Sequence, residues 1–245
     1  MSWNRLIDRW NKLTKQPDIQ AYDCKVCNAH FDLTSTNKFE TTDKFQAGTL
    51  IRYECPQCKV IFGDLRFLML SPSEIADDYM DLYSTISEAD TTSFILDIVN
   101  TVGLKQSEKI LDYACGAWNK HIQVLQSQGY DIIGYDPFVG SQRMLPPKED
   151  SYDIVMCNNY IEHVIDPIED LRKMVKLIKP GGRWIVSTSC FEYAFEFTHY
   201  HTYFFVSEES IRQLEDKLGI KCIHTQKVTW PHVNEFSIVK VFEKL

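Results

Sequence analysis

Residues 109–118 read KILDYACGAW, an apolar run that ends in a turn of small residues before a helix pattern. At such a turn the backbone has to come close to a ligand, and small side chains allow that approach. A second apolar run, residues 131–136, ends on Asp136, 24 residues beyond Asp112. A carboxylate in that position can accept hydrogen bonds from both hydroxyl groups of a ribose. The stretch therefore predicts a strand–turn–helix unit that binds a ligand carrying a ribose.

Downstream of this unit, short apolar runs continue to alternate with helix patterns. Strands that alternate with helices of 10–15 residues indicate βαβ units and a mainly parallel sheet. The last two runs, residues 221–228 and 236–244, have no helix pattern between them, so we expect them to form an antiparallel hairpin at one edge. We predict an α/β fold with a Rossmann-like, mainly parallel, seven-stranded sheet.

Four of the eight cysteines lie in two Cys-x-x-Cys pairs in the first quarter of the chain. Each pair offers two thiolates with the spacing that chelates one ion, and zinc prefers four tetrahedral ligands. A closed set of four thiolates is typical of a structural zinc site rather than a catalytic one. The pattern predicts a zinc ribbon whose structural Zn²⁺ is bound by Cys24, Cys27, Cys55 and Cys58.

These features divide the chain into three parts. We expect an N-terminal amphipathic helix over residues 1–20, the zinc-ribbon module over 21–70 and the sheet domain over 71–245. A helix pattern that follows Ser71-Pro72-Ser73-Glu74 links the ribbon to the sheet domain.

Charge and composition narrow the class of partner. Residues 1–63 hold nine Lys and Arg against seven Asp and Glu, whereas residues 64–245 hold seventeen against twenty-seven. A nucleic-acid enzyme usually presents a basic face, so the acidic sheet domain argues against nucleic acid and favours a small-molecule acceptor. Neither a stretch of 18 apolar residues nor a signal-peptide core is present, and the single remaining cysteines suit reduced thiols. We therefore expect a cytoplasmic protein without a transmembrane segment; the oligomeric state stays open.

Over residues 109–190, the runs ILDYACGAW, IIGYDP, SYDIVMCNNYIEHVIDP and LRKMVKLIKPGGRWIVST resemble, in order and spacing, class I methyltransferases that depend on S-adenosyl-L-methionine (AdoMet). Upstream, residues 53–83 resemble the zinc-ribbon lead-in of bacterial methyltransferases of surface-glycan and natural-product pathways. The resemblance implies an AdoMet-dependent methyltransferase whose acceptor is a hydroxyl group of a sugar, a sugar nucleotide or a related metabolite.

The resemblance also implies cofactor contacts for individual residues. The methionine part of AdoMet would be held by Asp112, Ala114, Cys115 and Gly116. The ribose would be held by Asp136, with Pro137 and Phe138 beside the adenine. The methyl-transfer region would be lined by Asn158, Asn159 and Tyr160. Tyr83, on one helix face with Tyr79, corresponds to a tyrosine that closes over AdoMet in relatives, although packing between modules explains it equally well.

The cofactor turn departs from the family's G-x-G-x-G pattern at two positions. Ala114 replaces the first glycine and Trp118 the third. We expect Trp118 either to reshape the pocket or to stack on the ligand. The stretch Met144-Leu145-Pro146-Pro147 also offers no carboxylate for the adenine amine.

Three histidines are candidates for the base that removes the acceptor's proton: His163, His199 and His201. Glu162-His163 resembles part of the metal-binding E-x-x-E-H motif of ubiquinone-pathway O-methyltransferases, but Asn159 replaces the first glutamate. Local hydrogen bonds around the next helix are the alternative role for this pair. Residues 191–205 concentrate aromatic residues with His199 and His201, which fits either a substrate pocket or aromatic packing with histidines bound to backbone groups.

Two other functions stay open from the sequence. The zinc ribbon could recognise an RNA or a protein substrate, and Trp118 could mark a protein that binds AdoMet without catalysis. The acceptor atom, which histidine is the base, and whether Glu162-His163 binds a metal also remain undetermined.

Overall fold

A computed structural model describes Asp8, Trp10–Asn11 and residues 19–43, 48–85, 90–116, 120–137, 147–192, 198–229 and 236–245. The chain divides into two compact units. The unit that we call the ribbon unit contains residues 1–87, 162–167 and 190–213, and the sheet unit contains residues 88–161, 168–189 and 214–245. The three-part division expected from the sequence stays a prediction.

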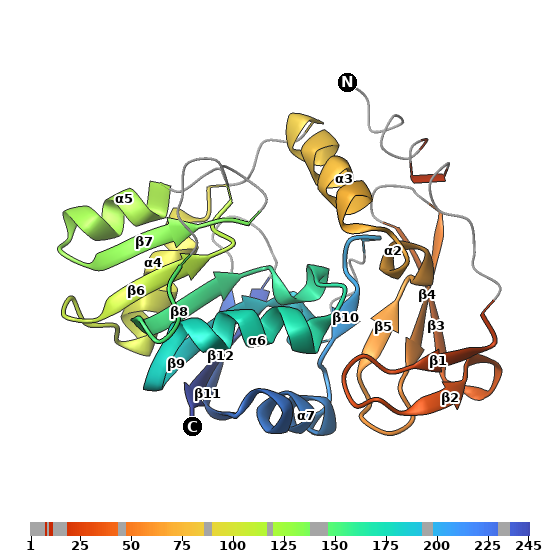
Figure 1. Ribbon diagram of the computed structural model, residues 1–245. Helices are drawn as coiled ribbons and strands as arrows, with labels where there is room; N and C mark the ends of the chain where they lie inside the picture. Colours follow the sequence, from red (N-terminus) through yellow and green to blue (C-terminus); the bar gives the residue numbers. More distant parts are fainter. Residues whose placement is uncertain are drawn as a thin grey trace. The chain divides into compact units, whose positions relative to one another are not determined.

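The sheet unit is built on six strands within the described residues, in the order β11-β12-β9-β8-β6-β7 (Figure 1). The four strands from β9 to β7 run parallel, and β12 pairs antiparallel with both β9 and β11. The predicted α/β fold with a mainly parallel sheet and an antiparallel edge hairpin is confirmed, and the described residues show six strands where seven were expected. The strands are β6 (Lys109–Tyr113), β7 (Asp131–Tyr135), β8 (Tyr152–Asn158), β9 (Ile178–Thr188), β11 (Ile220–Thr229) and β12 (Phe236–Lys244).

Helix α4 (Thr92–Val102) supplies much of the sheet unit's core. Four residues on its apolar side are fully buried: Phe94, Ile95, Ile98 and Val99. They pack with residues of β6, β8, β9 and β12. Burying a side chain of this size contributes roughly 1.5–3 kcal/mol, so this face holds the helix to the sheet.

Three further α-helices follow α4 within the described residues: α5 (Lys120–Ser127), α6 (Pro167–Leu177) and α7 (Glu208–Leu218). Helix α6 ends at Leu177, and β9 begins at Ile178. The turn at residues 179–182 lies inside this strand, where a register shift between Tyr152 and Ile154 of β8 accommodates it.

The ribbon unit contains two small antiparallel sheets. One pairs β1 (Ala21–Asp23) with β2 (His30–Asp32). The other has the order β10-β5-β4-β3, from β3 (Lys38–Thr42), β4 (Thr49–Glu54), β5 (Ile61–Gly63) and β10 (Tyr203–Phe204) (Figure 1). β10 lies about 140 residues beyond β5 in the chain and pairs with it, so a strand from the segment after β9 completes the sheet of the ribbon unit.

Two helices complete the ribbon unit, α2 (Leu65–Leu68) and α3 (Pro72–Thr85). Ser71 caps α3: its backbone N–H and its hydroxyl both donate to Glu74, as in a capping box. Most of the expected N-terminal helix lies outside the described residues. Within it, Trp10 is helical and buried, and its ring lies 5.8 Å from that of Phe67.

Candidate functional site

The carboxyl ends of the parallel strands β6, β7 and β8 meet at one edge of the sheet unit. Asp112 lies near the end of β6, and Asp136 follows directly after β7. Both carboxylates are buried. Ligands of open α/β sheets bind outside the carboxyl ends of the strands, so this edge is the position where a cofactor is expected.

The turn after β6 folds over the end of β7. The backbone N–H of Ala114 donates to the carbonyl oxygen of Tyr135 at 2.7 Å, and that of Gly116 donates to Asp136 Oδ2 at 3.0 Å. Ala114 and Gly116 have φ values of 59° and 68°, in the left-handed region that favours glycine. This conformation explains why glycine is usual where Ala114 stands. A carboxylate can accept several hydrogen bonds at once, as a ribose-binding group requires.

Asp112 forms a buried pair with a residue that the sequence analysis missed. His121 Nε2, on α5, lies 2.6 Å from Asp112 Oδ2. Burial raises the pKa of the Asp112 carboxyl, and the hydrogen bond with His121 acts in the opposite direction. His121 stands nine residues after Asp112, at the start of the helix that follows the turn. This position at the start of the helix is the feature of the sequence that could have indicated the pair with Asp112.

The segment after β8 contributes a third part of this edge. The side chain of Ser187, on β9, donates a short hydrogen bond to Asn158, and the backbone N–H of Asn159 donates to the carbonyl oxygen of Ser187 at 2.8 Å. Asn159 adopts a φ of 48°. The ring of Tyr160 lies 5.6 Å from that of Tyr113, edge to face. The structure thus brings Asn158–Tyr160 to the same strand ends as Asp112.

Several expected cofactor residues lie outside the description. Trp118 and Phe138 are outside the described residues, as are residues 193–197 of the aromatic loop. Tyr83 belongs to α3, but its side chain is outside the description as well. Pro137 is described and partly buried beside Asp136.

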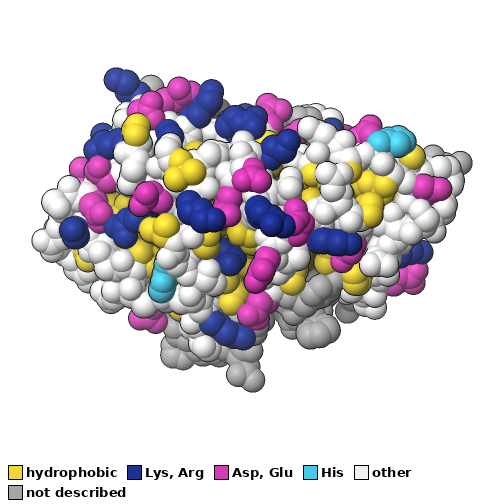
Figure 2. Space-filling view, turned by 90° about the horizontal axis from the view of Figure 1, so that it is seen from below, with side chains coloured by type: hydrophobic (Ala, Val, Ile, Leu, Met, Phe, Trp, Pro, Cys, Tyr) yellow, Lys and Arg dark blue, Asp and Glu magenta, His cyan; other side chains and the backbone are white. Residues whose placement is uncertain are grey.

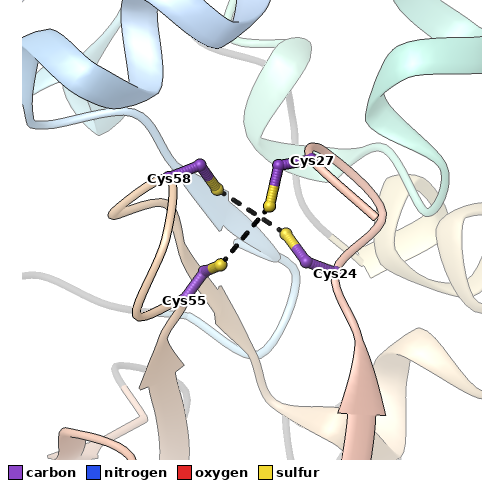
Figure 3. A group of neighbouring side chains, drawn as sticks. All are labelled: Cys24, Cys27, Cys55 and Cys58. Atoms are coloured by element: carbon purple, nitrogen blue, oxygen red, sulfur yellow. Dashed lines mark hydrogen bonds between the residues drawn. The ribbon is translucent and has the colours of Figure 1, made fainter. Parts of the chain in front are cut away.

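The four paired cysteines of the ribbon unit converge on one point (Figure 3). The sulfur atoms of Cys24 and Cys58 are 3.6 Å apart, as are those of Cys27 and Cys55. A disulfide requires about 2.05 Å between sulfurs, so these are separate thiols. Zinc–sulfur bonds of about 2.3 Å in a tetrahedron place sulfur atoms about 3.8 Å apart. The geometry therefore fits a tetrahedral zinc ion.

His163, in the short helix Ile161–His163 of the ribbon unit, bonds to a distant part of the chain. Its Nδ1 lies 3.0 Å from the carbonyl oxygen of Tyr200. A carbonyl only accepts hydrogen bonds, so Nδ1 carries the hydrogen and Nε2 keeps its lone pair when the ring is neutral. Burial lowers the pKa of His163 from 6.5 to about 4, against the effect of this hydrogen bond. His163 is consequently a neutral imidazole at pH 7.

His201 lies beside His163, with 5.2 Å between the ring centroids. Glu162 completes the cluster: one carboxylate oxygen of Glu162 and one ring nitrogen each of His163 and His201 all lie within 4.8 Å of one another. The backbone of Glu162 is fixed as well, since its carbonyl oxygen accepts from both the N–H and the hydroxyl of Thr202. Two imidazoles and a carboxylate at this spacing can pass a proton or bind a divalent cation.

His199 lies in a different environment from the other two candidate histidines. Its backbone N–H donates to Asp43 Oδ1 at 2.8 Å, and its Nδ1 lies 3.1 Å from the same oxygen. The ring packs 4.5 Å from Trp10, and the side chain is almost fully buried. These contacts match the alternative in which a histidine of the aromatic loop is part of the packing.

On the face shown in Figure 2, Lys and Arg side chains alternate with Asp and Glu side chains among the described residues. The expectation against nucleic acid stays a prediction. Within the described part of the chain, none of the helices has both the length and the apolar character of a membrane span.

Comparison with known proteins gives one family. The sequence model described as "methyltransferase domain" matches residues 87–225, more than half of the chain. Among curated proteins, the ubiquinone biosynthesis O-methyltransferase of Aliivibrio fischeri is 30% identical, with 33% of this chain and 44% of that protein covered. That of Caulobacter vibrioides is 46% identical over 25% of this chain and 23% of its own length. The chain thus spans less than half the length of these relatives.

A solved structure supports the fold. The 1,6-didemethyltoxoflavin-N1-methyltransferase of Burkholderia thailandensis, with bound 1,6-didemethyltoxoflavin and S-adenosylhomocysteine, superposes with a TM-score of 0.50. The sequences are 16% identical, and the match covers 80% of this chain and 95% of that one. At this identity the likeness concerns the fold alone.

Proposed function

The chain belongs to the methyltransferase domain family, and from that premise we propose that it transfers a methyl group from AdoMet to a hydroxyl oxygen of a small molecule. The observation that carries the proposal is the grouping of Asp112, Gly116 and Asp136 at the carboxyl edge of the sheet. When bound, AdoMet supplies a methyl group on a positively charged sulfur. An oxygen nucleophile can attack this methyl carbon in line with the carbon–sulfur bond, and S-adenosylhomocysteine is the leaving group.

The residues of the edge suit the parts of AdoMet. Asp136 would accept hydrogen bonds from the ribose hydroxyls, because its carboxylate is fixed by the N–H of Gly116. The left-handed turn at Ala114 and Gly116 brings backbone close to the methionine part. S-adenosylhomocysteine is bound in the toxoflavin-pathway neighbour, which has the same fold. These points support AdoMet as the cofactor.

A hydroxyl acceptor has to lose its proton as the methyl group arrives. His163 is the base that we propose, since Nε2 of its neutral ring holds a free lone pair. His201 is the neighbour that could take the proton on from it. The chain runs from Tyr160 through Ile161 directly into Glu162 and His163, so the proposed base follows the proposed methyl-transfer segment without a break.

The acceptor class is the finer part of the proposal. The curated relatives are named for O-methylation in ubiquinone biosynthesis. Within small hydroxyl compounds we propose a sugar, a sugar nucleotide or a related metabolite, on the resemblance of residues 53–83. Tritium-labelled AdoMet offered with sugar nucleotides, with phenols and with RNA separates the candidates. Label in sugar nucleotides supports the class, label in phenols alone contradicts it, and label in RNA favours a macromolecular substrate.

Two substitutions test the base. His163→Asn should reduce turnover by about 10²-fold, within the range that general-base catalysis contributes. His199→Asn, which removes a histidine committed to Asp43, is the comparison variant and should retain most of its turnover per folded molecule.

Assays after dialysis against EDTA address the alternative use of Glu162, His163 and His201. Activity lost in EDTA and restored by Mg²⁺ would assign the cluster to a metal.

The cysteine cluster is proposed to hold one structural zinc ion. Its support is the fit between the 3.6 Å sulfur separations and the tetrahedral geometry. Elemental analysis should find one zinc per chain, and Cys58→Ser should lose it together with the fold of the ribbon unit. None of the eight cysteines forms a disulfide, which supports the cytoplasm as the proposed compartment.

A further inference from the structure

A buried arginine of the ribbon fixes the turn that carries His201. Arg52 lies on β4 and is 2% exposed. Its Nη2 donates to the carbonyl oxygen of Thr198 at 2.8 Å and to that of His201 at 3.1 Å. Because the N–H of His201 also donates to the carbonyl oxygen of Thr198, residues 198–201 form a hydrogen-bonded turn. One nitrogen of Arg52 therefore binds both ends of this turn.

The surroundings of Arg52 fix the guanidinium group. Nη1 donates to Thr41 Oγ1 at 3.0 Å, and the group lies 5.1 Å from the ring centre of Phe204. Burial lowers the pKa of Arg52 to about 10, partly offset by the charges of Cys190, Asp64 and Asp43, so the group stays positive at neutral pH. A rigid planar group held on several sides can transmit its position to the turn.

The same turn connects to His163 and to the ribbon. Tyr200, inside the turn, supplies the carbonyl oxygen that accepts from His163 Nδ1. Asp43, one residue after β3, accepts the backbone N–H of His199. Arg52 and Asp43 thus bind the turn 198–201, and the turn itself accepts the hydrogen bond of His163.

We propose that Arg52 is a positioning residue for the reaction: through the turn 198–201 it sets the place of His201 and the hydrogen bond that fixes the tautomer of His163. Arg52 of the ribbon unit would thereby position the two histidines to which we assign proton transfer. This inference rests on the proposed function of the two histidines.

The test is imidazole ¹⁵N NMR of the whole 245-residue chain loaded with zinc, with signals assigned through His163→Asn and His201→Asn. Arg52→Gln should move the signals of both histidines, with His163 losing its single tautomer. Arg52→Lys keeps the charge that balances Asp43, but its ammonium ends one bond short of Nη2 and cannot reach both carbonyls. It should move the same signals while zinc content and S-adenosylhomocysteine affinity stay at the wild-type level.

Arg66→Gln is the matched control, because Arg66 is a second, largely buried arginine of the same unit. Its hydrogen-bond partners are Asp64 and the carbonyl oxygen of Thr49, outside the turn 198–201, and its guanidinium lies over the ring of Trp10. It should lower stability without moving the two histidine signals. If Arg52→Gln does not retain zinc, Arg52→Lys alone decides. Wild-type signals in Arg52→Lys would overturn the proposal.

Turnover separates this inference from the function on which it rests. With an acceptor found by the labelled-AdoMet assay, Arg52→Lys should lower kcat by about 10-fold or more and leave KM for AdoMet unchanged. An unchanged kcat would also overturn the positioning role. If His163→Asn and His201→Asn both keep wild-type turnover while the Arg52 variants still move the signals, the proton-transfer role fails and the structural coupling stands.

Discussion

His163 donates its Nδ1 hydrogen to the carbonyl oxygen of Tyr200, 37 residues further along the chain. This bond decides the chemistry of the ring, since it leaves Nε2 as the acceptor. It also shows that the hydrogen bonds of Glu162-His163 are not only local, which was the alternative role for this pair. A histidine oriented in this way can remove a proton without a preceding change of tautomer.

The low pKa of His163 predicts a neutral ring in mildly acidic solution. Its pKa in the folded protein is about 4, below the ordinary 6.5. Between these values the unfolded chain binds more protons, so the stability that His163 contributes is complete above pH 6.5 and is lost as the pH falls towards 4. An imidazole ¹⁵N titration should give a midpoint near 4. A midpoint between 6 and 7 would contradict the burial argument.

Ala114→Gly should stabilise the protein by about 1 kcal/mol, because a non-glycine residue at a φ of 59° is strained. The unfolding free energy from denaturant titration is the measurement. Ala76→Gly, in the interior of α3, serves as the comparison and should destabilise by about 1 kcal/mol. Equal signs for the two substitutions would show that the turn is not strained.

His121→Phe should destabilise the sheet unit by roughly 1–3 kcal/mol, because it leaves the buried Asp112 without its partner. Burial already raises the pKa of Asp112, and the loss of His121 removes the interaction that opposes this shift. Stability held by a raised carboxyl pKa is lost as the pH rises, so the penalty should be larger at pH 7 than at pH 5. Urea titrations at both values provide the check, and a penalty that grows at pH 5 would speak against the pair.

The sequence predicted what depends on local pattern. The alternation of apolar runs and helix patterns predicted all six strands of the sheet unit, and the spacing of Asp112 and Asp136 predicted that both lie at one sheet edge. The helix start at residues 71–74 was predictable for the same reason, since Ser71 and Glu74 lie within one helix turn. The two Cys-x-x-Cys pairs predicted the convergence of four thiols, because each pair chelates as a unit.

Contacts between distant segments were not predictable. Arg52 and Thr198 are 146 residues apart, and neither has a local pattern that marks it for the other. The strand β10 has two residues, too few for a period, and joins β5 only through the fold. His199 and His201 look equivalent in the sequence, yet one binds Asp43 and the other lies beside His163.

The most direct test of the account is the affinity of S-adenosylhomocysteine for wild type and Asp136→Ala, measured by calorimetry. Losing the carboxylate removes charge-assisted hydrogen bonds to the ribose, worth roughly 1.5–3 kcal/mol, so affinity should fall by about 10-fold or more. Asp97→Ala, an exposed substitution on α4, is the control and should bind as wild type does. Equal affinity in wild type and Asp136→Ala would contradict the assignment of the cofactor to this edge.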